Sequence, residues 1–380
     1  MQVPLLDLKS QLNSIESELC EAVLDVIRSC NYIMGPKIAE LESLVASYTG
    51  SKFAVAVSSG SDALLAALMA LNIGPGDLVI TSPHSFFASA GAIARLHAKP
   101  VFVDIDPKTF NMDPAALEAW FEEHQDKAKD VKAIIPVHLF GQCADMAPIL
   151  ALAERYNIPV VEDAAQAIGA RYELPGRGEC CAGTMGVMGC LSFFPSKNLG
   201  GIGDGGMVLT NEASLAEKLR KLRVHGSQPK YYHSLIGGNF RLDPIQAAAL
   251  IVKMPYLESW HQSRRQHASF YDEQLPREYI QPPHVAYPRR FHIYNQYVIT
   301  APTCRDELRS FLSEKQISTE IYYPVPFHLQ ECFKYLGYQK GAFPNAEHAA
   351  LNTFAVPVYP ELTSQMQEYV IDAIRQFFVK

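Results

Sequence analysis

The sequence predicts an α/β protein in which helices cover both faces of a mostly parallel sheet, followed by a smaller carboxy-terminal α+β domain. Through the first half, short β-branched runs alternate with helical stretches, which is typical of such a sheet. The chain has 380 residues, enough for two or three domains. From about residue 250 the alternation stops. We therefore expect a large domain over residues 1–245 and a small one over residues 246–380, packed as one rigid body.

Strands buried on both faces of a sheet are short and apolar, and their helical crossovers are longer. The predicted strands, in order, are Phe53–Ser58, Leu78–Thr81, Pro100–Asp104, Ala133–Val137, Val160–Asp163, Cys190–Phe194 and Met207–Thr210. The predicted helices among them are Asp62–Leu71, Ala88–Leu96, Met146–Tyr156 and Ala213–Val224. The smaller domain begins with one long helical stretch, Pro244 to Leu275. A segment rich in proline and aromatic residues, a helix over Arg305–Lys315, a proline-interrupted strand and a closing helix over Thr363–Phe378 complete it.

Composition and charge exclude several classes of partner. Lys plus Arg number 33 and Asp plus Glu number 40, so the net charge of −7 gives no footprint for nucleic acid. The longest apolar run, Leu64 to Leu71, is far shorter than a membrane span, and the amino terminus lacks the features of a signal peptide. The eight cysteines are scattered, without the CxxC spacing of a zinc site. We expect reduced thiols, a cytoplasmic location, no bound metal, and small molecules or a second copy as partners.

Three segments carry residues suited to chemistry where strands meet helices, the place where α/β sheets bind ligands. Val57 to Asp62 runs from a strand through Ser and Gly into a helix, which suits a phosphate, although a Ser/Asp helix cap alone explains most such turns. Asp163 ends an apolar strand, where its carboxylate needs a cationic partner or a structural hydrogen bond. Lys197 lies between an apolar strand and a glycine-rich loop, where it is either an amine nucleophile or a lysine that reaches the surface.

The glycine-rich run at residues 201–206 matches GxGxxG, the fingerprint of dinucleotide binding. It precedes a predicted strand, whereas the fingerprint should open a helix, so it argues against a nicotinamide or flavin site. A phosphate cradle, an acid able to pair with a protonated ring nitrogen, and a lysine able to form a Schiff base are together what a pyridoxal-phosphate site requires.

The order and wording of the motifs resemble the DegT/DnrJ/EryC1/StrS sugar aminotransferases, which have the aspartate-aminotransferase fold (fold type I). The resemblance covers nearly the whole chain and includes VSSGSDALLAALMAL, IPVVEDAAQAIGA, LSFFPSKNLGGIGDGG and GGNFRLDPIQAAAL. It implies a pyridoxal 5′-phosphate (PLP) enzyme that passes through the pyridoxamine phosphate form. The amino group would move from an amino acid, most simply L-glutamate, to a nucleotide-linked keto sugar.

The resemblance also implies roles for matching residues. Lys197 would bind the cofactor as a Schiff base and shuttle the proton, and Asp163 would keep the pyridine nitrogen protonated. The other implied cofactor contacts are Phe86, which would stack on the ring, Gln166, which would flank it, and Gly60, Ser61 and Ser192 at the phosphate. Asn239 resembles an asparagine that reaches the phosphate from the neighbouring subunit, which implies a homodimer with shared active sites. Phe86 could instead pack in the core, and Asn239 could be a helix cap.

The substrate side is less defined. His225 and His328 would either touch the sugar or nucleotide or be structural histidines, and Tyr322 stands where many relatives carry His. We expect a dTDP-3-keto-6-deoxyhexose, with a UDP-linked or 4-keto sugar as the alternative. Two other functions remain open: a pyridoxamine-dependent dehydratase, against which Lys197 argues because those relatives carry His there, and a non-catalytic regulatory relative that binds the cofactor.

Overall fold

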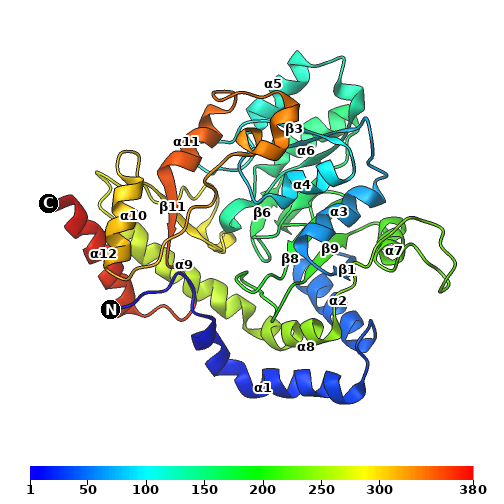
Figure 1. Cartoon of the computed structure of the whole chain (residues 1–380), viewed down its shortest axis with the longest axis horizontal. Coiled ribbons are helices and arrows are strands. Elements are labelled where there is room, and N and C mark those ends of the chain that lie inside the picture. Colours follow the sequence, from blue (N-terminus) through cyan, green and yellow to red (C-terminus); the bar gives the residue numbers. More distant parts are fainter. Residues whose placement is uncertain (380) are drawn as a thin grey trace.

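The centre of the computed structural model, which describes residues 1–379, is a sheet of seven strands (Figure 1). Their spatial order is β3-β2-β4-β5-β8-β9-β1. Bridges Ile134–Val160 and Val137–Asp163 join the three-stranded and four-stranded parts, and β9 runs antiparallel to both its neighbours. The mostly parallel sheet is therefore confirmed. The strands are β1 (Phe53–Val57), β2 (Leu78–Thr81), β3 (Lys99–Phe102), β4 (Val131–Ile135), β5 (Val161–Asp163), β8 (Met188–Ser192) and β9 (Gly206–Thr210).

Helices cover both faces of this sheet because alternate strand residues point to opposite sides. Ala54 and Ala56 of β1 join one buried cluster, whereas Val55 and Val57 join the other. The first cluster is covered by α2 (Pro36–Thr49), α5 (Pro114–Glu123), α6 (Met146–Tyr156) and α8 (Pro244–Lys253). The second is covered by α3 (Gly60–Ala70), α4 (Ala88–Arg95) and α7 (Ala213–Leu222). A short hairpin of β6 (Arg171–Leu174) and β7 (Gly178–Cys181) packs beside the first cluster.

The predicted elements agree with the structure in type, and most differ from it by one or two residues at their ends. The strand expected over residues 190–194 lies two residues earlier, as β8, and that over residues 133–137 likewise, as β4. The helical stretch predicted over residues 244–275 is helical up to residue 274 but is divided: a 3₁₀ turn at Met254–Tyr256 separates α8 from α9 (Leu257–Gln274). Pro255 lies in that turn and has no N–H to continue the helical ladder.

Four helices fall outside the predicted elements: α1 (Leu8–Ser29), α2, α5 and α11 (Pro344–Asn352). Two of them have a readable boundary signal, one at its start and one at its end. Asp113 caps α5 through a hydrogen bond from the N–H of Ala115 (2.9 Å), and a proline follows it. Gly50 ends α2 in the left-handed conformation, with φ of 79°. The long α1 lies along α8 at the edge of the molecule (Figure 1).

The smaller part of the molecule has its own core around a two-stranded antiparallel sheet, β10 (Tyr297–Thr300) and β11 (Thr353–Val356). Helices α9, α10 (Arg305–Glu314) and α12 (Ser364–Val379) pack around it. Val3 pairs with Ile317, so the first residues of the chain run along this part, whereas α8 packs on the larger core. Division of the chain between residues 245 and 246 stays a prediction.

An aromatic cluster joins the two parts. Phe102 at the end of β3 contacts Phe327, Phe333 and Phe343 of the carboxy-terminal half, with ring centroids 5.9–6.2 Å apart. Such pairs are worth about 0.5–1.5 kcal/mol each beyond the area they bury. This contact holds the smaller part against the strand ends. Among residues 1–379, every helix is too short or too polar to cross a lipid bilayer.

A buried carboxylate fixes the loop between β7 and β8. Glu162 in β5 is fully buried and accepts hydrogen bonds from the backbone N–H groups of Gly183 (2.8 Å), Met185 (2.7 Å) and Gly186 (2.6 Å). His138 Nε2 donates a fourth at 2.8 Å, and its Nδ1 accepts from the N–H of Ala144 (3.0 Å). These bonds define a neutral imidazole and a fully satisfied carboxylate.

We predict that Glu162→Gln lowers the free energy of unfolding by about 3 kcal/mol, because the amide N–H₂ would face backbone donors in a buried site. Denaturant unfolding would measure the loss. Glu118→Gln is the matched control, since its bond to Arg155 (3.1 Å) is exposed and should be worth less than about 1 kcal/mol. Equal losses in the two variants would contradict the role of Glu162.

Candidate active site

A cavity of about 390 Å³ opens where the carboxyl ends of the strands meet the smaller part of the molecule. Gly60 and Ser61 follow β1, Phe86 follows β2, and Gln166 follows β5. Gln296, Tyr322 and Tyr323 close it from the carboxy-terminal half. The predicted cofactor residues that line it are Gly60, Ser61, Phe86, Asp163, Gln166, Ser192 and Lys197. These seven residues, spread over some 140 positions of sequence, come together as the resemblance implied.

One end of the cavity is the amino terminus of α3. Ser59 caps this helix by accepting a hydrogen bond from the N–H of Asp62 (3.0 Å), and free N–H groups of the first turn attract anions. Gly60 lies so close to Ser192 that an added Cβ would be 2.7 Å from the Cβ of the serine. Only glycine lets the serine hydroxyl and the helix terminus share one cradle. This end is suited to a phosphate.

Asp163 supplies the negative charge in the middle of the cavity. Its Oδ2 accepts from Ser89 Oγ (2.7 Å), and its Oδ1 accepts from the N–H of Ala165 (3.2 Å). Burial raises the pKa of this carboxyl, and the bonds from Ser89 and Ala165 oppose that rise. Ser85 Oγ lies 3.1 Å from Ser89 Oγ, so a chain of two hydroxyls supports the carboxylate. Asp163 is therefore held in place before any ligand binds.

Lys197 is the cationic counterpart of Asp163. It follows β8, and its N–H donates to the carbonyl of Phe194 (2.8 Å), which turns the chain into the cavity. Burial lowers the pKa of its ammonium group to about 8, and the charge of Asp163 opposes the shift. A lysine with this pKa is partly neutral near pH 7–8 and can act as a nucleophile toward a carbonyl. The alternative of a lysine that reaches the surface does not fit its place in the cavity.

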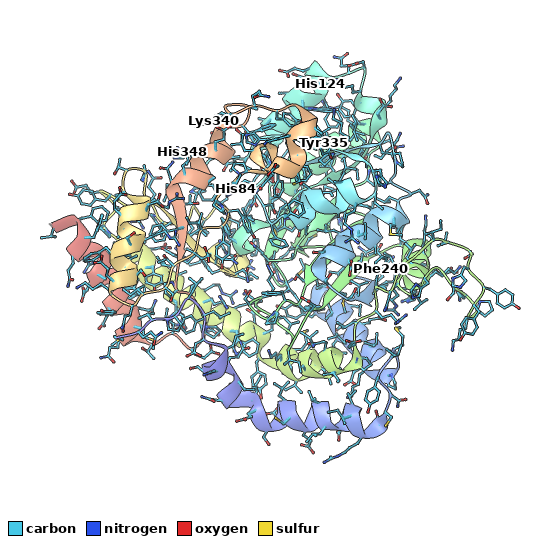
Figure 2. The ribbon with its side chains drawn as sticks, viewed as in Figure 1. His84, His124, Phe240, Tyr335, Lys340 and His348 are labelled. Atoms are coloured by element: carbon cyan, nitrogen blue, oxygen red, sulfur yellow. The ribbon has the colours of Figure 1, made fainter. Side chains whose placement is uncertain are left out.

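Gln166 and Tyr323 form a hydrogen bond in which the donor and the acceptor are fixed. The N–H of Phe140 donates to Gln166 Oε1 (2.7 Å), so the amide nitrogen faces Tyr323 and donates to its hydroxyl oxygen (3.0 Å). Burial raises the pKa of Tyr323, which keeps its O–H as a donor. Its ring lies 6.3 Å from that of His84, which Figure 2 shows near the middle of the molecule. Phe86 keeps 56% of its side chain exposed beside this pair and offers a free aromatic face.

Three predicted residues lie outside the cavity lining. Asn239 is exposed and pairs through its backbone with Val224, and His225 is exposed directly before the loop around residues 226–240, which carries exposed Tyr231. His328 is buried, and its Nε2 bonds Glu347 at 2.9 Å, which is the structural alternative for this histidine. Of the predicted substrate residues, Tyr322 lines the cavity.

The sequence reasoning did not find Ser89, Tyr323 or Gln296. Ser89 is 74 positions from Asp163, and Tyr323 is 157 positions from Gln166, so no local pattern joins them. The four-residue spacing between Ser85, in the loop before α4, and Ser89, in the first turn of α4, is the one local signal available.

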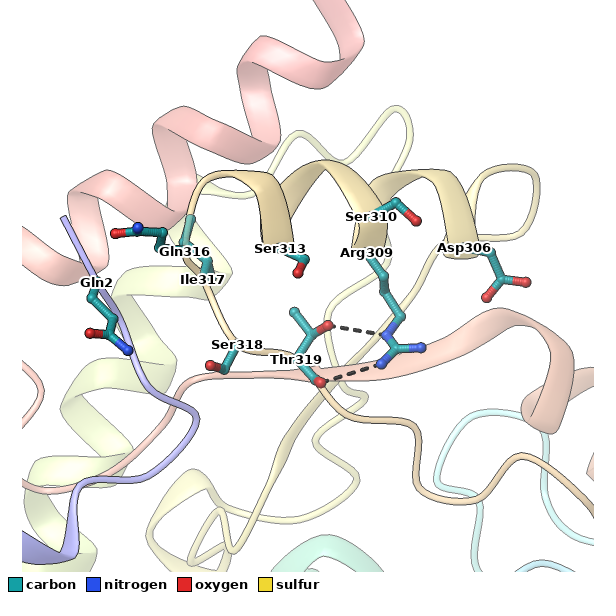
Figure 3. A pocket seen from close by; sticks show the side chains of 9 residues that line it. All are labelled: Gln2, Asp306, Arg309, Ser310, Ser313, Gln316, Ile317, Ser318 and Thr319. Carbon is teal, nitrogen blue, oxygen red and sulfur yellow. Dashed lines mark hydrogen bonds between the residues drawn. The ribbon is translucent and has the colours of Figure 1, made fainter.

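A larger groove of about 770 Å³ lies elsewhere, between α10 and residues 316–319 (Figure 3). Its cation, Arg309, already donates to Thr319 Oγ1 (3.1 Å) and to the carbonyl of Thr319 (3.3 Å). The groove shares no lining residue with the cavity at Lys197, so its size does not make it the active site.

Comparisons with known proteins match the chain over nearly its full length. Residues 13–375 match the model of the DegT/DnrJ/EryC1/StrS aminotransferase family. The "Pleiotropic regulatory protein" of Geobacillus stearothermophilus is 48% identical, covering 100% of this chain and 99% of that protein. The UDP-N-acetyl-3-dehydro-alpha-D-glucosamine 3-aminotransferase of Acidithiobacillus ferrooxidans is 39% identical, covering 98% and 97%. The dTDP-3-amino-3,4,6-trideoxy-alpha-D-glucose transaminase of Streptomyces venezuelae is 38% identical, covering 99% and 96%.

A solved structure agrees. A DegT DnrJ EryC1 StrS aminotransferase from Brucella abortus superposes with a TM-score of 0.93 at 37% identity, over 100% of both chains. The fold is therefore that of the fold type I aminotransferases, as the sequence resemblance implied. The chain belongs to the DegT/DnrJ/EryC1/StrS aminotransferase family.

Proposed function

We propose that the protein is a PLP-dependent aminotransferase that moves the amino group of L-glutamate to a nucleotide-linked 3-keto sugar. The observation that carries this proposal is the meeting of three groups in one cavity: the amino terminus of α3, the buried carboxylate of Asp163 and the Lys197 amine, whose pKa is about 8. These groups are complementary to a phosphate, a protonated ring nitrogen and an aldehyde.

The residues present fit the cofactor. Gly60, Ser61 and Ser192 would hold the phosphate, because the close approach at Gly60 leaves a cradle that a Cβ would fill. Asp163 would hold the ring nitrogen, and the exposed face of Phe86 would pack on the ring. When bound, PLP supplies an electron sink that makes the hydrogen on the amine-bearing carbon acidic.

The protein's own side chains would transfer the proton and limit the access of bulk water to the cavity. The neutral amine of Lys197 would hold the cofactor through its aldehyde carbon, and once free again the Nζ atom would take and return the proton at the amine-bearing carbon. Asp163, supported by Ser89, keeps a negative charge in the cavity where the ring nitrogen would lie. Tyr322 and Tyr323 wall the cavity on the side of the smaller part and reduce its contact with bulk water.

The substrate class rests on the family and the names of its members. The Acidithiobacillus relative is named for amination of a UDP-linked sugar at carbon 3, and the Streptomyces relative for a dTDP-linked 3-amino sugar. We propose carbon 3 as the aminated position and a dTDP-3-keto-6-deoxyhexose as the first substrate to test. UDP-linked and 4-keto sugars are the alternatives. The reaction would take place in the cytoplasm, where eight free cysteines such as those of this chain stay reduced.

A regulatory function is the second candidate, because the Geobacillus relative carries a regulatory name at 48% identity. The complete set of Lys197, Asp163 and Ser192 in one cavity favours catalysis over sensing. Turnover separates the two functions, since a sensor would bind cofactor or glutamate without producing an amino sugar.

Visible spectroscopy of the cofactor-loaded protein tests the function. The absorption band should bleach with L-glutamate and return when the correct keto sugar is added from a panel of dTDP-linked 3-keto, UDP-linked 3-keto and 4-keto sugars. Mass spectrometry would identify the amino sugar.

In Lys197→Ala, turnover should fall by at least about 10⁴-fold, because nucleophile and proton carrier are lost together. Full activity of Lys197→Ala, or no response to any amino acid, would overturn the proposal.

The pH dependence of cofactor capture tests the state of Lys197. The neutral amine attacks, so the rate at which the apoprotein captures PLP should rise with pH and level off above a midpoint near 8. Asp163→Asn removes the charge that stabilises the ammonium form, so the midpoint should move to lower pH. Stopped-flow absorbance would measure it. Lys52→Gln, an exposed lysine on another surface, is the control and should leave the midpoint in place. A midpoint at the ordinary lysine value of 10.5 would refute the assignment.

We also propose a homodimer in which Asn239 completes the partner's phosphate site. The loop around residues 226–240 extends away from the body beside α7 (Figure 1), and its Tyr231, Tyr232 and Ile236 are 78%, 72% and 91% exposed. Side chains this apolar and exposed are typical of a surface that another chain covers. Asn239 lies at the base of the loop, outside its own cavity.

Mixed dimers test this sharing. Lys197→Ala and Asn239→Ala would each be weak alone at limiting cofactor, but co-expression forms hybrids in which one site has both native residues. Each hybrid dimer would contain one intact site. We therefore expect its activity to be well above the mean activity of the two single-variant dimers. Activity that never exceeds that mean, or a protein that sediments as a monomer, would show that the sites are not shared.

A further inference from the structure

Two buried asparagines join the loop that carries Lys197 to the smaller part of the molecule. Asn198 directly follows Lys197, and Asn295 directly precedes Gln296 of the cavity wall. Asn295 Nδ2 donates a hydrogen bond to Asn198 Oδ1 (2.7 Å), although the two residues are 97 positions apart. Asn198 Nδ2 in turn donates to the carbonyl of Ile293 (3.0 Å). We call these two hydrogen bonds the asparagine clasp.

The two amide groups of the clasp have one consistent orientation. The carbonyl of Ile293 can only accept, so the nitrogen of Asn198 must face it, which turns the Asn198 oxygen toward Asn295. That oxygen can also only accept, so Asn295 must present its nitrogen. A flipped amide at either position would bring two like groups together in a buried place. The clasp therefore holds one geometry.

The smaller part holds its end of the clasp from two sides. The N–H of Ile293 donates to the carbonyl of Gly141 (3.0 Å). The N–H of Asn295 donates to the carbonyl of Phe140 (2.9 Å), and a Cβ on Gly141 would lie 2.9 Å from this same nitrogen. From the other side, Arg264 of α9 donates through Nη1 to the carbonyl of Asn295 (3.3 Å). This end of the clasp is therefore a fixed support.

The loop at the other end depends on such supports for its path. It is rich in glycine, so few of its own side chains restrict its backbone. The N–H of Lys197 bonds within the loop, to the carbonyl of Phe194 (2.8 Å). Asn198 ties the next residue to the smaller part, and Lys253 of α8 ties the loop again by donating from Nζ to the carbonyl of Gly200 (2.7 Å). The clasp is the tie that adjoins the lysine.

We propose that Asn198 and Asn295 are positioning residues that fix the amine of Lys197 relative to the substrate-facing wall of the cavity. This role rests on the proposed function, in which Lys197 is the reacting amine. Because the lysine side chain is long and flexible, the place of its amine depends on where its backbone is held. The clasp links the residue after Lys197 to the residue before Gln296, so the amine and the wall move as one unit.

The pKa of Lys197 reports where its amine lies. Burial lowers this pKa to about 8 and is a larger effect than the opposing charge of Asp163. An amine that moved toward water would regain its hydration, and its pKa would rise toward 10.5. The other titratable side chains that line the cavity, within residues 1–379, are Asp204, Tyr322 and Tyr323. Burial raises the pKa of both tyrosines, so they stay neutral, and the clasp bonds none of these groups.

Asn295→Leu tests the clasp by removing its donor and keeping a side chain of similar size. We expect the pH midpoint for capture of PLP by the apoprotein to rise by about one unit, because the amine gains contact with water. Asn198→Leu, which loses both hydrogen bonds, should raise it at least as far. Stopped-flow absorbance would measure the midpoint, and borohydride reduction with mass spectrometry would show that the adduct forms at Lys197.

Asn345→Leu is the matched control. Asn345 of α11 also joins the carboxy-terminal half to the larger part, since its Nδ2 donates to the carbonyl of Ile105 (2.9 Å), and neither residue lines the cavity. This variant should unfold at lower denaturant concentration and keep the midpoint near 8. A clasp with a merely structural role would behave in the same way, so the midpoint separates positioning from stability.

A double variant keeps the test decisive if the single variants fold poorly. Asn198→Leu with Asn295→Leu replaces both amides by apolar groups, which leaves fewer unpaired polar atoms than either single change and should recover stability. It lacks the directional hydrogen bonds, so its midpoint should stay raised. A structural role predicts instead that the midpoint recovers together with the stability.

Single-turnover kinetics of the cofactor-loaded protein give a second readout. In Asn295→Leu, bleaching at saturating L-glutamate should slow by at least about tenfold, while the half-saturating concentration changes by less than about twofold, because misplacing the amine affects proton transfer more than donor binding. If the midpoint stays near 8 in every folded clasp variant while the wild-type protein captures PLP, the clasp does not position Lys197 and the proposed function stands. Failure of the wild-type protein to form the adduct at Lys197 would overturn both.

Discussion

The structure depends on two adjacent buried carboxylates at the end of β5. Glu162 and Asp163 point to opposite sides of the strand, as neighbouring strand residues must. Glu162 is satisfied by three backbone donors and His138, so it ties the loop before β8 to the sheet. Asp163 keeps only Ser89 and one backbone N–H, which leaves acceptor capacity for a ligand. The same strand therefore anchors the fold with one acid and presents the other to the cavity.

The second constraint is the close approach of backbones where β8 and β9 meet the start of α3. A Cβ at Gly60 would press on Ser192, and one at Gly206 would lie 2.3 Å from the carbonyl of Ser59. Because both positions are glycine, the carboxyl ends of β1 and β8 and the start of β9 can lie close together beside α3. The anion cradle and Lys197, five residues beyond Ser192, thus follow from the packing of the sheet itself.

Local sequence signals identify the cofactor side of the site and much of the sheet. Asp163 and Ser192 each end a strand and Lys197 follows five residues after Ser192, and the strand period and apolar runs mark those strand ends within about two residues. The signals fail where structure depends on distant contacts. The break at Pro255 was hidden within an apolar helical pattern, and Tyr323 reaches Gln166 only because the aromatic cluster around Phe102 docks the smaller part. From the sequence, His328 could contact the substrate, whereas in the structure it is buried and bonded to Glu347.

This division has a chemical consequence. Residues before position 200 supply the cradle, the acid and the amine, which serve any substrate of the same cofactor. Residues after position 290, among them Gln296, Tyr322 and Tyr323, wall the opposite side and carry no formal charge. A nucleotide sugar is anionic and the chain has a net charge of −7, so attraction must come from groups outside this wall. In the proposed homodimer, the exposed loop around residues 226–240 of the partner subunit, with His225 and Asn239 at its base, would be the element to supply them.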